Sequence, residues 1–161
     1  MQTHFLFDVL EGYQPFEQIA EESRRDGAVI AASGLAGAQK AHLACALAAR
    51  TGRPLVFLCD SERSAAQTME DVSALMGGGV SLFPAREITF YQDVAASREV
   101  AYRRIEAMRK LVSGEVRAIV APVDAMLHRV MPRAVFSANT ISLRVGDVLP
   151  TDQLIERLLA A

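Results

Sequence analysis

The sequence has few of the residues that form disulfides and metal centres. Only two cysteines and three histidines occur among its 161 residues. Cys45 lies in an apolar helical stretch and Cys59 ends an apolar strand, so both are expected to be core thiols in a reducing compartment. His4, His42 and His128 are scattered, without C-x-x-C or H-x-x-x-H spacing. The sequence therefore predicts no metal site.

Long apolar runs and an excess of positive charge are also missing. No run approaches the ~20 apolar residues of a membrane helix, and Asp8 and Glu11 follow the apolar start too closely for a signal peptide. The formal net charge is −2, so no basic field draws the chain to nucleic acid. We expect a cytoplasmic protein with no membrane partner, and any DNA role would be indirect or local.

What the chain does contain is an alternation of apolar strands and amphipathic helices. Strands are predicted at 28–32, 55–59, 80–83 and 118–121, with helices at 37–50, 62–76 and 97–112. The run 55–59 is continuously apolar, so both faces of its sheet are expected to be buried. Short loops between β-α-β units require right-handed crossovers. The predicted fold class is α/β, a doubly wound parallel sheet with flanking helices.

The two ends of the chain have a different texture. Two short helices, over 5–12 and from Pro15 onward, precede the first strand. After Pro132, residues 141–145 alternate as a half-exposed strand does, and Thr151 caps an amphipathic helix. A strand and a helix alone cannot bury their apolar sides.

Three parts are therefore predicted. They are an N-terminal helical appendage over 1–27, an α/β domain over 28–133, and the beginning of a truncated second α+β domain over 134–161. The 161 residues are expected to be a fragment of a longer protein.

The stretch 28–41 has the layout of a phosphate-binding loop. The pattern G-x-x-x-x-G-K-[ST] supplies a lysine to the β/γ-phosphates and a hydroxyl to Mg²⁺. Gly34, Gly37 and Lys40 are present, but Gln39 stands where glycine is required and Ala41 where the hydroxyl is required. A methyl group cannot ligate magnesium, and a side chain at 39 resists a positive φ. The loop is degenerate, and we expect none of these five residues to bind a cofactor.

Individual residues leave other interpretations open. A bound phosphate would explain Lys40 in the first turn of a helix, where the macrodipole disfavours a cation, although a solvated relic is the simpler explanation. Asp60 and Asp124 end apolar strands, as a magnesium-holding acid does, but helix capping is favoured for both. Ser33 is not a nucleophile elbow, because G-x-S-x-G is absent. No catalytic constellation is predicted.

The helix predicted over 97–112 carries mixed charge. Its basic residues are Arg98, Arg103, Arg104, Arg109 and Lys110. A basic helix can bind phosphate backbones. Glu99 and Glu106 are spaced for i,i+3 and i,i+4 ion pairs, which favours a solvated face.

Five stretches, in order, resemble the bacterial transcription-repair coupling factors, also called Mfd. They are residues 33–43, 82–99, 103–108, 121–126 and 142–147. The resemblance covers roughly residues 28–161 and rests on the order of the stretches more than on any one of them.

This resemblance implies the UvrB-like N-terminal region of such a factor, with a helicase-like fold and no ATPase activity. The whole factor displaces stalled RNA polymerase at DNA lesions and recruits UvrA for nucleotide-excision repair. UvrA would be bound mostly through residues past Ala161, and RNA polymerase and DNA through other domains. ATP and Mg²⁺ would serve the later motor domains. The fragment itself is then not an enzyme and has no cofactor.

Two other interpretations remain. Lys40 and Asp60 support a P-loop nucleotide-binding domain of an ATP-dependent enzyme. A doubly wound domain with no role in repair is the third, since such folds host many functions.

Overall fold

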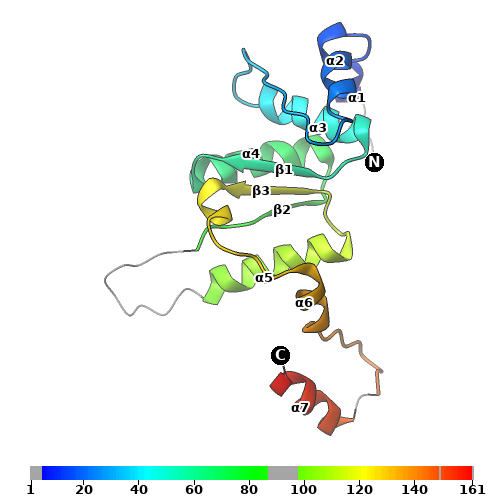
Figure 1. The fold of residues 1–161 in the computed structure, drawn as a ribbon, viewed down its shortest axis with the longest axis vertical. Coiled ribbons are helices and arrows are strands. Elements are labelled where there is room, and N and C mark those ends of the chain that lie inside the picture. The colour runs from blue at the N-terminus through cyan, green and yellow to red at the C-terminus, as the bar shows by residue number, and fades with distance from the viewer. Residues whose placement is uncertain (1–4, 87–97, 149, 161) are drawn as a thin grey trace, which may run out of the picture. The chain divides into compact units, whose positions relative to one another are not determined.

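A computed structural model describes residues 5–86, 98–148 and 150–160 (Figure 1). The chain divides into two compact units, Met1–His128 and Arg129–Ala161, and each is described by itself. His4, Ser97 and residues 87–96, which belong to the resembling stretch 82–99, lie outside the described residues. Among the helices of the described part, none is long and apolar enough to cross a membrane.

The first unit alternates helices and strands much as the sequence predicts. Its helices are α1 (Phe5–Asp8), α2 (Gln14–Glu22), α3 (Gln39–Thr51), α4 (Glu62–Met76) and α5 (Arg98–Ser113), followed by the 3-10 helix η1 (Val123–Met126). Its strands are β1 (Leu55–Cys59), β2 (Val80–Leu82) and β3 (Ala118–Pro122). For α3 to α5 and all three strands, the bounds agree with the predicted ones to within a residue or two.

The three strands form a parallel sheet in the order β1-β3-β2. The central strand β3 pairs on one side with β1, from Leu55 opposite Ala118 to Cys59 opposite Pro122. On its other side it pairs with β2, from Val80 opposite Ala118. The predicted α/β class, with a parallel sheet flanked by helices, is confirmed at this level.

Helices cover both faces of the sheet, with α3 and α4 on one side and α5 on the other (Figure 1). The core beneath α3 and α4 is built from small and medium apolar side chains: Ala41, Cys45, Cys59, Ala65, Val72, Ala118 and Val120. The core beneath α5 contains Phe83, Ala107, Val116, Ile119, Ala121 and Ala125. Successive residues of β3 therefore enter opposite cores, which is the period of a strand buried on both faces.

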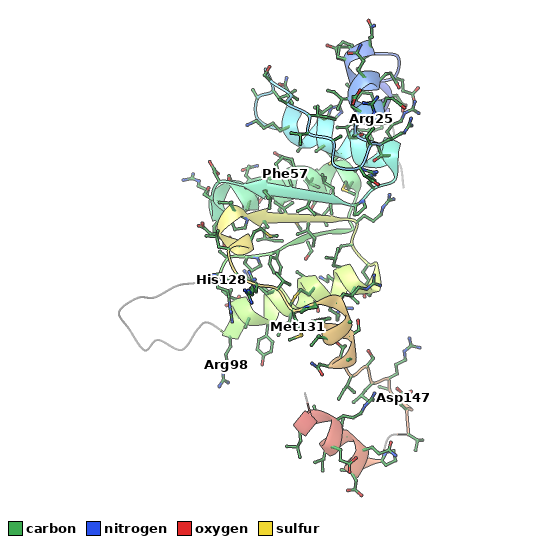
Figure 2. All side chains as sticks on the ribbon, in the orientation of Figure 1. Arg25, Phe57, Arg98, His128, Met131 and Asp147 are labelled. Atoms are coloured by element: carbon green, nitrogen blue, oxygen red, sulfur yellow. The ribbon has the colours of Figure 1, made fainter. Side chains whose placement is uncertain are left out.

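The prediction that residues 55–59 are buried on both faces is wrong for one face. Phe57 packs against the core beneath α3 and α4 (Figure 2), but Val56 is 60% exposed and Leu58 is also exposed. These two pair with Ile119 and Ala121, so they lie on the α5 side of the sheet. The core beneath α5 is built on β2 and β3, and it does not extend over the edge strand β1.

The prediction of a strand at residues 28–32 is also wrong. The Ala28 N–H donates to the Arg25 carbonyl at 3.3 Å, and Val29 beyond it is 97% exposed. A strand needs a neighbour for its backbone N–H and C=O groups. No described strand pairs with this run. Apolar composition indicated burial here, but it could not supply the strand's partner.

Contacts around Gly52 and Arg53 hold the segment that follows α2, from which the loop leading to α3 begins. Gly52 has a left-handed φ of 70° and ends α3. The Arg53 guanidinium then donates to the Ser23 carbonyl at 2.9 Å, to the Arg24 carbonyl at 2.9 Å and to the Asp26 carboxylate at 3.1 Å. The chain leaving α2 is thus held at the entrance to β1.

The second unit contains α6 (Arg133–Ala138), which was not predicted, and α7 (Thr151–Ala160), which was. The strand predicted at residues 141–145 is wrong, because the run is irregular and ends in a turn. In that turn, the Arg144 N–H donates to the Asp147 carboxylate at 2.8 Å, and the Asp147 N–H donates to the Arg144 carbonyl at 3.0 Å (Figure 2). A strand needs a neighbouring strand to pair with, and the described part of this unit contains none. Alternating polarity alone therefore did not produce a strand at residues 141–145.

Candidate functional site

The candidate site is the glycine loop that leads into α3. Gly34 and Gly37 have φ values of +81° and +50°, which side chains with a Cβ rarely adopt. Both glycines predicted for the loop therefore sit at positions that require them. Most of the loop is exposed, and Leu35 is half-buried.

Gln39 closes this loop on itself through two hydrogen bonds to Ala36. The Ala36 N–H donates to the Gln39 side-chain oxygen at 2.9 Å. The Gln39 N–H donates back to the Ala36 carbonyl at 3.1 Å. We call this pair of bonds the Ala36–Gln39 clasp. The sequence did not predict it, although a long amide side chain in the first helical turn after a glycine loop was a signal for such a bond.

Lys40 and Ala41 lie in different surroundings. Lys40 is exposed, and its N–H donates to the Gly37 carbonyl at 3.4 Å. Ala41 is only 2% exposed and packs in the core with Cys45 and Val72. Successive residues of a helix point about 100° apart, so a core-facing residue 41 follows a solvent-facing residue 40. A side chain at position 41 points toward the core.

A half-open cavity of about 530 Å³ lies behind the loop. Its lining comes from the N-terminal helices, the loop and α3: Leu10, Tyr13, Pro15, Phe16, Ile19, Ala32, Ser33, Gly34, Leu35, Gln39, His42 and Leu43. Gly34 and Gln39 are the two predicted loop residues that it includes, whereas Lys40 and Ala41 are outside it. Sequence patterns did not indicate that α2 forms a wall of this cavity.

His42, in the first half of α3, ties that helix to α1. Its Nε2 lies 2.7 Å from the Leu6 carbonyl oxygen, and its ring lies 5.6 Å from the Phe7 ring. Within the described ranges, no three histidine, cysteine, aspartate or glutamate side chains gather closely enough to hold a metal ion.

Asp60, at the carboxyl end of β1, lies where a magnesium-binding acid would be expected. Its carboxylate accepts hydrogen bonds from the hydroxyls of Ser64 and Ser61. These bonds, that from Ser64 first, lower the pKa of Asp60. Ser61 is the N-cap of α4, and Ser61 and Ser64 form a reciprocal capping box. The predicted capping role thus falls to Ser61, with Asp60 bonded to both hydroxyls. Asp124, the other candidate acid, lies in η1.

The basic residues of α5 are largely engaged with acids of the same region. Arg109 contacts Glu106 at 2.9 Å and Glu115 at 2.5 Å, and Arg103 contacts Glu99 at 2.5 Å. The hydrogen bond from Arg109 lowers the pKa of Glu106 to about 2. This is the ion-paired arrangement that the spacing favoured over a phosphate-binding helix. Arg98, the first residue of α5, is exposed (Figure 2).

Arg104 differs from its neighbours because its side chain is buried, at 7% exposure. Its Nη1 donates to the Pro84 carbonyl at 2.6 Å and lies 3.5 Å from the Ala125 carbonyl. Its guanidinium carbon lies 4.0 Å from the centroid of the Phe83 ring. Burial, and then the charge of Arg86, lower the pKa of Arg104. The sequence grouped Arg104 with surface charges and missed its role in joining the ends of β2 and β3.

Comparison with known proteins gives relatives of a single kind. A transcription-repair-coupling factor from Myxococcus xanthus is 31% identical over 156 residues, which is 92% of this chain and 13% of that protein. The chain is a partial homologue of the transcription-repair coupling factors. The factor of Bacillus subtilis (strain 168) is 28% identical over 128 residues, covering 79% of this chain and 11% of the relative.

The coupling factor of Haemophilus influenzae is 26% identical over 106 residues, or 66% of this chain and 9% of that protein. The chain thus spans roughly a tenth of the length of the coupling factors it matches. No protein-family model matches the chain, and no solved structure matches it. The predicted resemblance to coupling factors is confirmed by these relatives.

Proposed function

We propose that this chain acts as a non-catalytic module of a transcription-repair coupling factor. The observation that carries the proposal is the 31% identity to the Myxococcus xanthus factor across 92% of the chain. In this proposal the complete factor displaces stalled RNA polymerase at DNA lesions, recruits UvrA for nucleotide-excision repair, and acts in the cytoplasm. The module is UvrB-like, with a helicase-like fold and a degenerate phosphate loop.

The loop's geometry supports a non-catalytic role. Ala41, in the position of the magnesium-binding hydroxyl, has a methyl group that packs in the core. Asp60, in the position of a magnesium-holding acid, accepts two hydroxyl hydrogen bonds beside the capping box of α4. Phosphoryl transfer depends on a cation held between such groups. Neither residue is arranged for that task.

The domain boundaries remain part of the proposal. They are a helical appendage over 1–27, the UvrB-like domain over 28–133 and the beginning of an UvrA-binding-type domain over 134–161. UvrA contacts lie mostly in residues that follow this stretch in a complete coupling factor. RNA polymerase, DNA, ATP and Mg²⁺ are partners and cofactors of other domains.

Lys40 favours a second candidate, a nucleotide-binding domain of an ATP-dependent enzyme. It is an exposed cation in the first turn of α3, where a helix N-terminus attracts anions instead. Under this alternative, Lys40 would contact the phosphates of ATP, and its removal would cost function.

One experiment separates the two candidates. This chain would replace the matching 156-residue segment of the Myxococcus xanthus factor, and survival after ultraviolet irradiation would be scored in cells lacking their own factor. We expect the chimaera to restore survival above that of a factor lacking the segment. We expect Lys40→Ala in the chimaera to leave survival unchanged.

Two results would overturn the proposal. A chimaera that performs no better than the deletion would contradict a role as a coupling-factor module. A chimaera that works, but loses function with Lys40→Ala at an unchanged protein level, would favour the nucleotide-binding alternative. Arg63→Ala, which removes an exposed cation from the first turn of α4, is the matched control.

A further inference from the structure

We propose that Gln39 is an internal substitute for a phosphate oxygen. Its side-chain carbonyl takes the N–H that an anion would take, and so holds the loop closed without a ligand. The inference rests on the proposed function, because it explains how a loop of this layout serves as structure in a non-catalytic module. It assigns Gln39 as the residue that decides whether the loop can bind phosphate.

The first step is the chemistry that a phosphate loop requires. Such loops bind phosphate because several backbone N–H groups point at the ligand and are satisfied by its oxygens. Without a ligand, these donors need other acceptors or water, since an unpaired backbone N–H is costly once it leaves solvent. In an exposed loop that binds no phosphate, each of these donors is left to water or to an acceptor within the chain.

The second step is where the loop's donors go in this chain. The Ala36 N–H bonds to the Gln39 side-chain oxygen at 2.9 Å. The N–H groups of Gln39 and Lys40 bond to the carbonyls of Ala36 and Gly37 at 3.1 and 3.4 Å. Three N–H groups, those of Ala36, Gln39 and Lys40, are thus bonded to acceptors within the loop and the first turn of α3. The acceptor for Ala36 is the one that a side chain provides, so a substitution can remove it.

The third step is that Gln39 is the residue at which the loop departs from the phosphate-binding pattern. That pattern has a glycine at this position, which provides no acceptor. A neutral amide oxygen offers the same kind of lone pair to an N–H as a phosphate oxygen does. Replacing the glycine by glutamine therefore removes the ligand's place and supplies a substitute in one change. The effect does not depend on Lys40, whose side chain lies in solvent.

The test compares the unaltered chain with Gln39→Ala, which removes the acceptor, and Gln39→Glu, which keeps it. Two quantities are measured by NMR: the hydrogen-exchange rate of the Ala36 amide, and the shifts of the loop amides during titration with inorganic phosphate. The exposed Gln67→Ala on α4 is the matched control. Amide spectra outside the loop report whether each variant is folded.

In Gln39→Ala we expect the Ala36 amide to exchange roughly threefold to tenfold faster, as loss of one hydrogen bond implies. Saturable phosphate shifts should appear at Ala36 in this variant and be absent in the unaltered chain. Gln39→Glu should keep the slow exchange and repel phosphate, and Gln67→Ala should change neither quantity.

An unchanged Ala36 exchange rate in Gln39→Ala would overturn the clasp. Faster exchange without phosphate shifts would overturn the idea that Gln39 replaces a phosphate oxygen, and so would phosphate shifts in the unaltered chain. None of these results depends on repair, so failure here is distinct from failure of the chimaera.

Discussion

At the scale of single residues, Ala41 carries the strongest argument about the loop. The motif assigns this position to a magnesium-binding hydroxyl, but the side chain is 2% exposed within the core beneath α3 and α4. The sequence alone could identify the missing hydroxyl. It could not show that a hydroxyl restored there would face the core. The motif assumes a strand at residues 28–32 ahead of the loop, and the structure lacks that strand.

Ala41→Thr is expected to destabilise the fold without restoring magnesium binding. The larger side chain overpacks the core and places a hydroxyl among apolar groups, which lowers the free energy of unfolding by about 1–3 kcal/mol. Ala49→Thr, on the exposed side of α3, should cost only about 0.5 kcal/mol. Urea unfolding of both variants measures the difference, and equal losses would show that position 41 is not confined.

Arg104 gives a second prediction at this scale. Arg104→Met removes the hydrogen bond to Pro84 and the contact with Phe83. Because a buried carbonyl then loses its donor, we expect a loss of about 2–3 kcal/mol in the free energy of unfolding. Arg103→Met breaks an exposed ion pair with Glu99 and should cost at most about 0.5 kcal/mol. Denaturant titration of the two variants would refute this assignment if Arg103→Met were the costlier change.

At the scale of elements, α5 links charge to pH. The hydrogen bond from Arg109 lowers the pKa of Glu106 from 4.5 to about 2, and Arg109 also lowers the pKa of Glu115. A carboxylate whose pKa is lower in the folded state adds stability above its unfolded pKa. That stability is lost as pH falls through the folded value.

The free energy of unfolding is therefore expected to fall as the pH drops from about 5 to about 2. Glu106→Gln removes one source of this dependence, so its stability should vary less with pH than that of the unaltered chain. Glu70→Gln, at an exposed position on α4, is the control. Unfolding curves across this range measure the effect, and identical slopes for Glu106→Gln and the unaltered chain would contradict it.

Elements with local signals were the ones the sequence predicted well. Helix α4 has a serine N-cap at Ser61 and a left-handed glycine at Gly77, and its predicted bounds match the observed ones. The runs 28–32 and 141–145 had strand composition but found no partner strand. Strand pairing is a non-local property, so periodicity indicated which faces would be apolar without showing whether a ladder forms.

At the scale of the whole molecule, the order of motifs pointed to coupling factors and the relatives agree. The sequence also predicted the bounds of α3 to α5 and of the three observed strands to within a residue or two. It did not foresee that α2 would share a cavity with the glycine loop, or that Gln39 would close that loop. The cavity depends on contacts between segments far apart in the sequence, and the Gln39 hydrogen bond depends on a local loop conformation that the motif pattern does not specify.

The central claim is that this chain is a module without nucleotide chemistry. The measurement that tests it most directly is a calorimetric titration of the chain with Mg-ATP. We predict no saturable heat at millimolar nucleotide, because the Ala36–Gln39 clasp closes the loop and Ala41 faces the core. Saturable binding that Lys40→Ala abolishes would contradict the account and establish the loop as a working phosphate site.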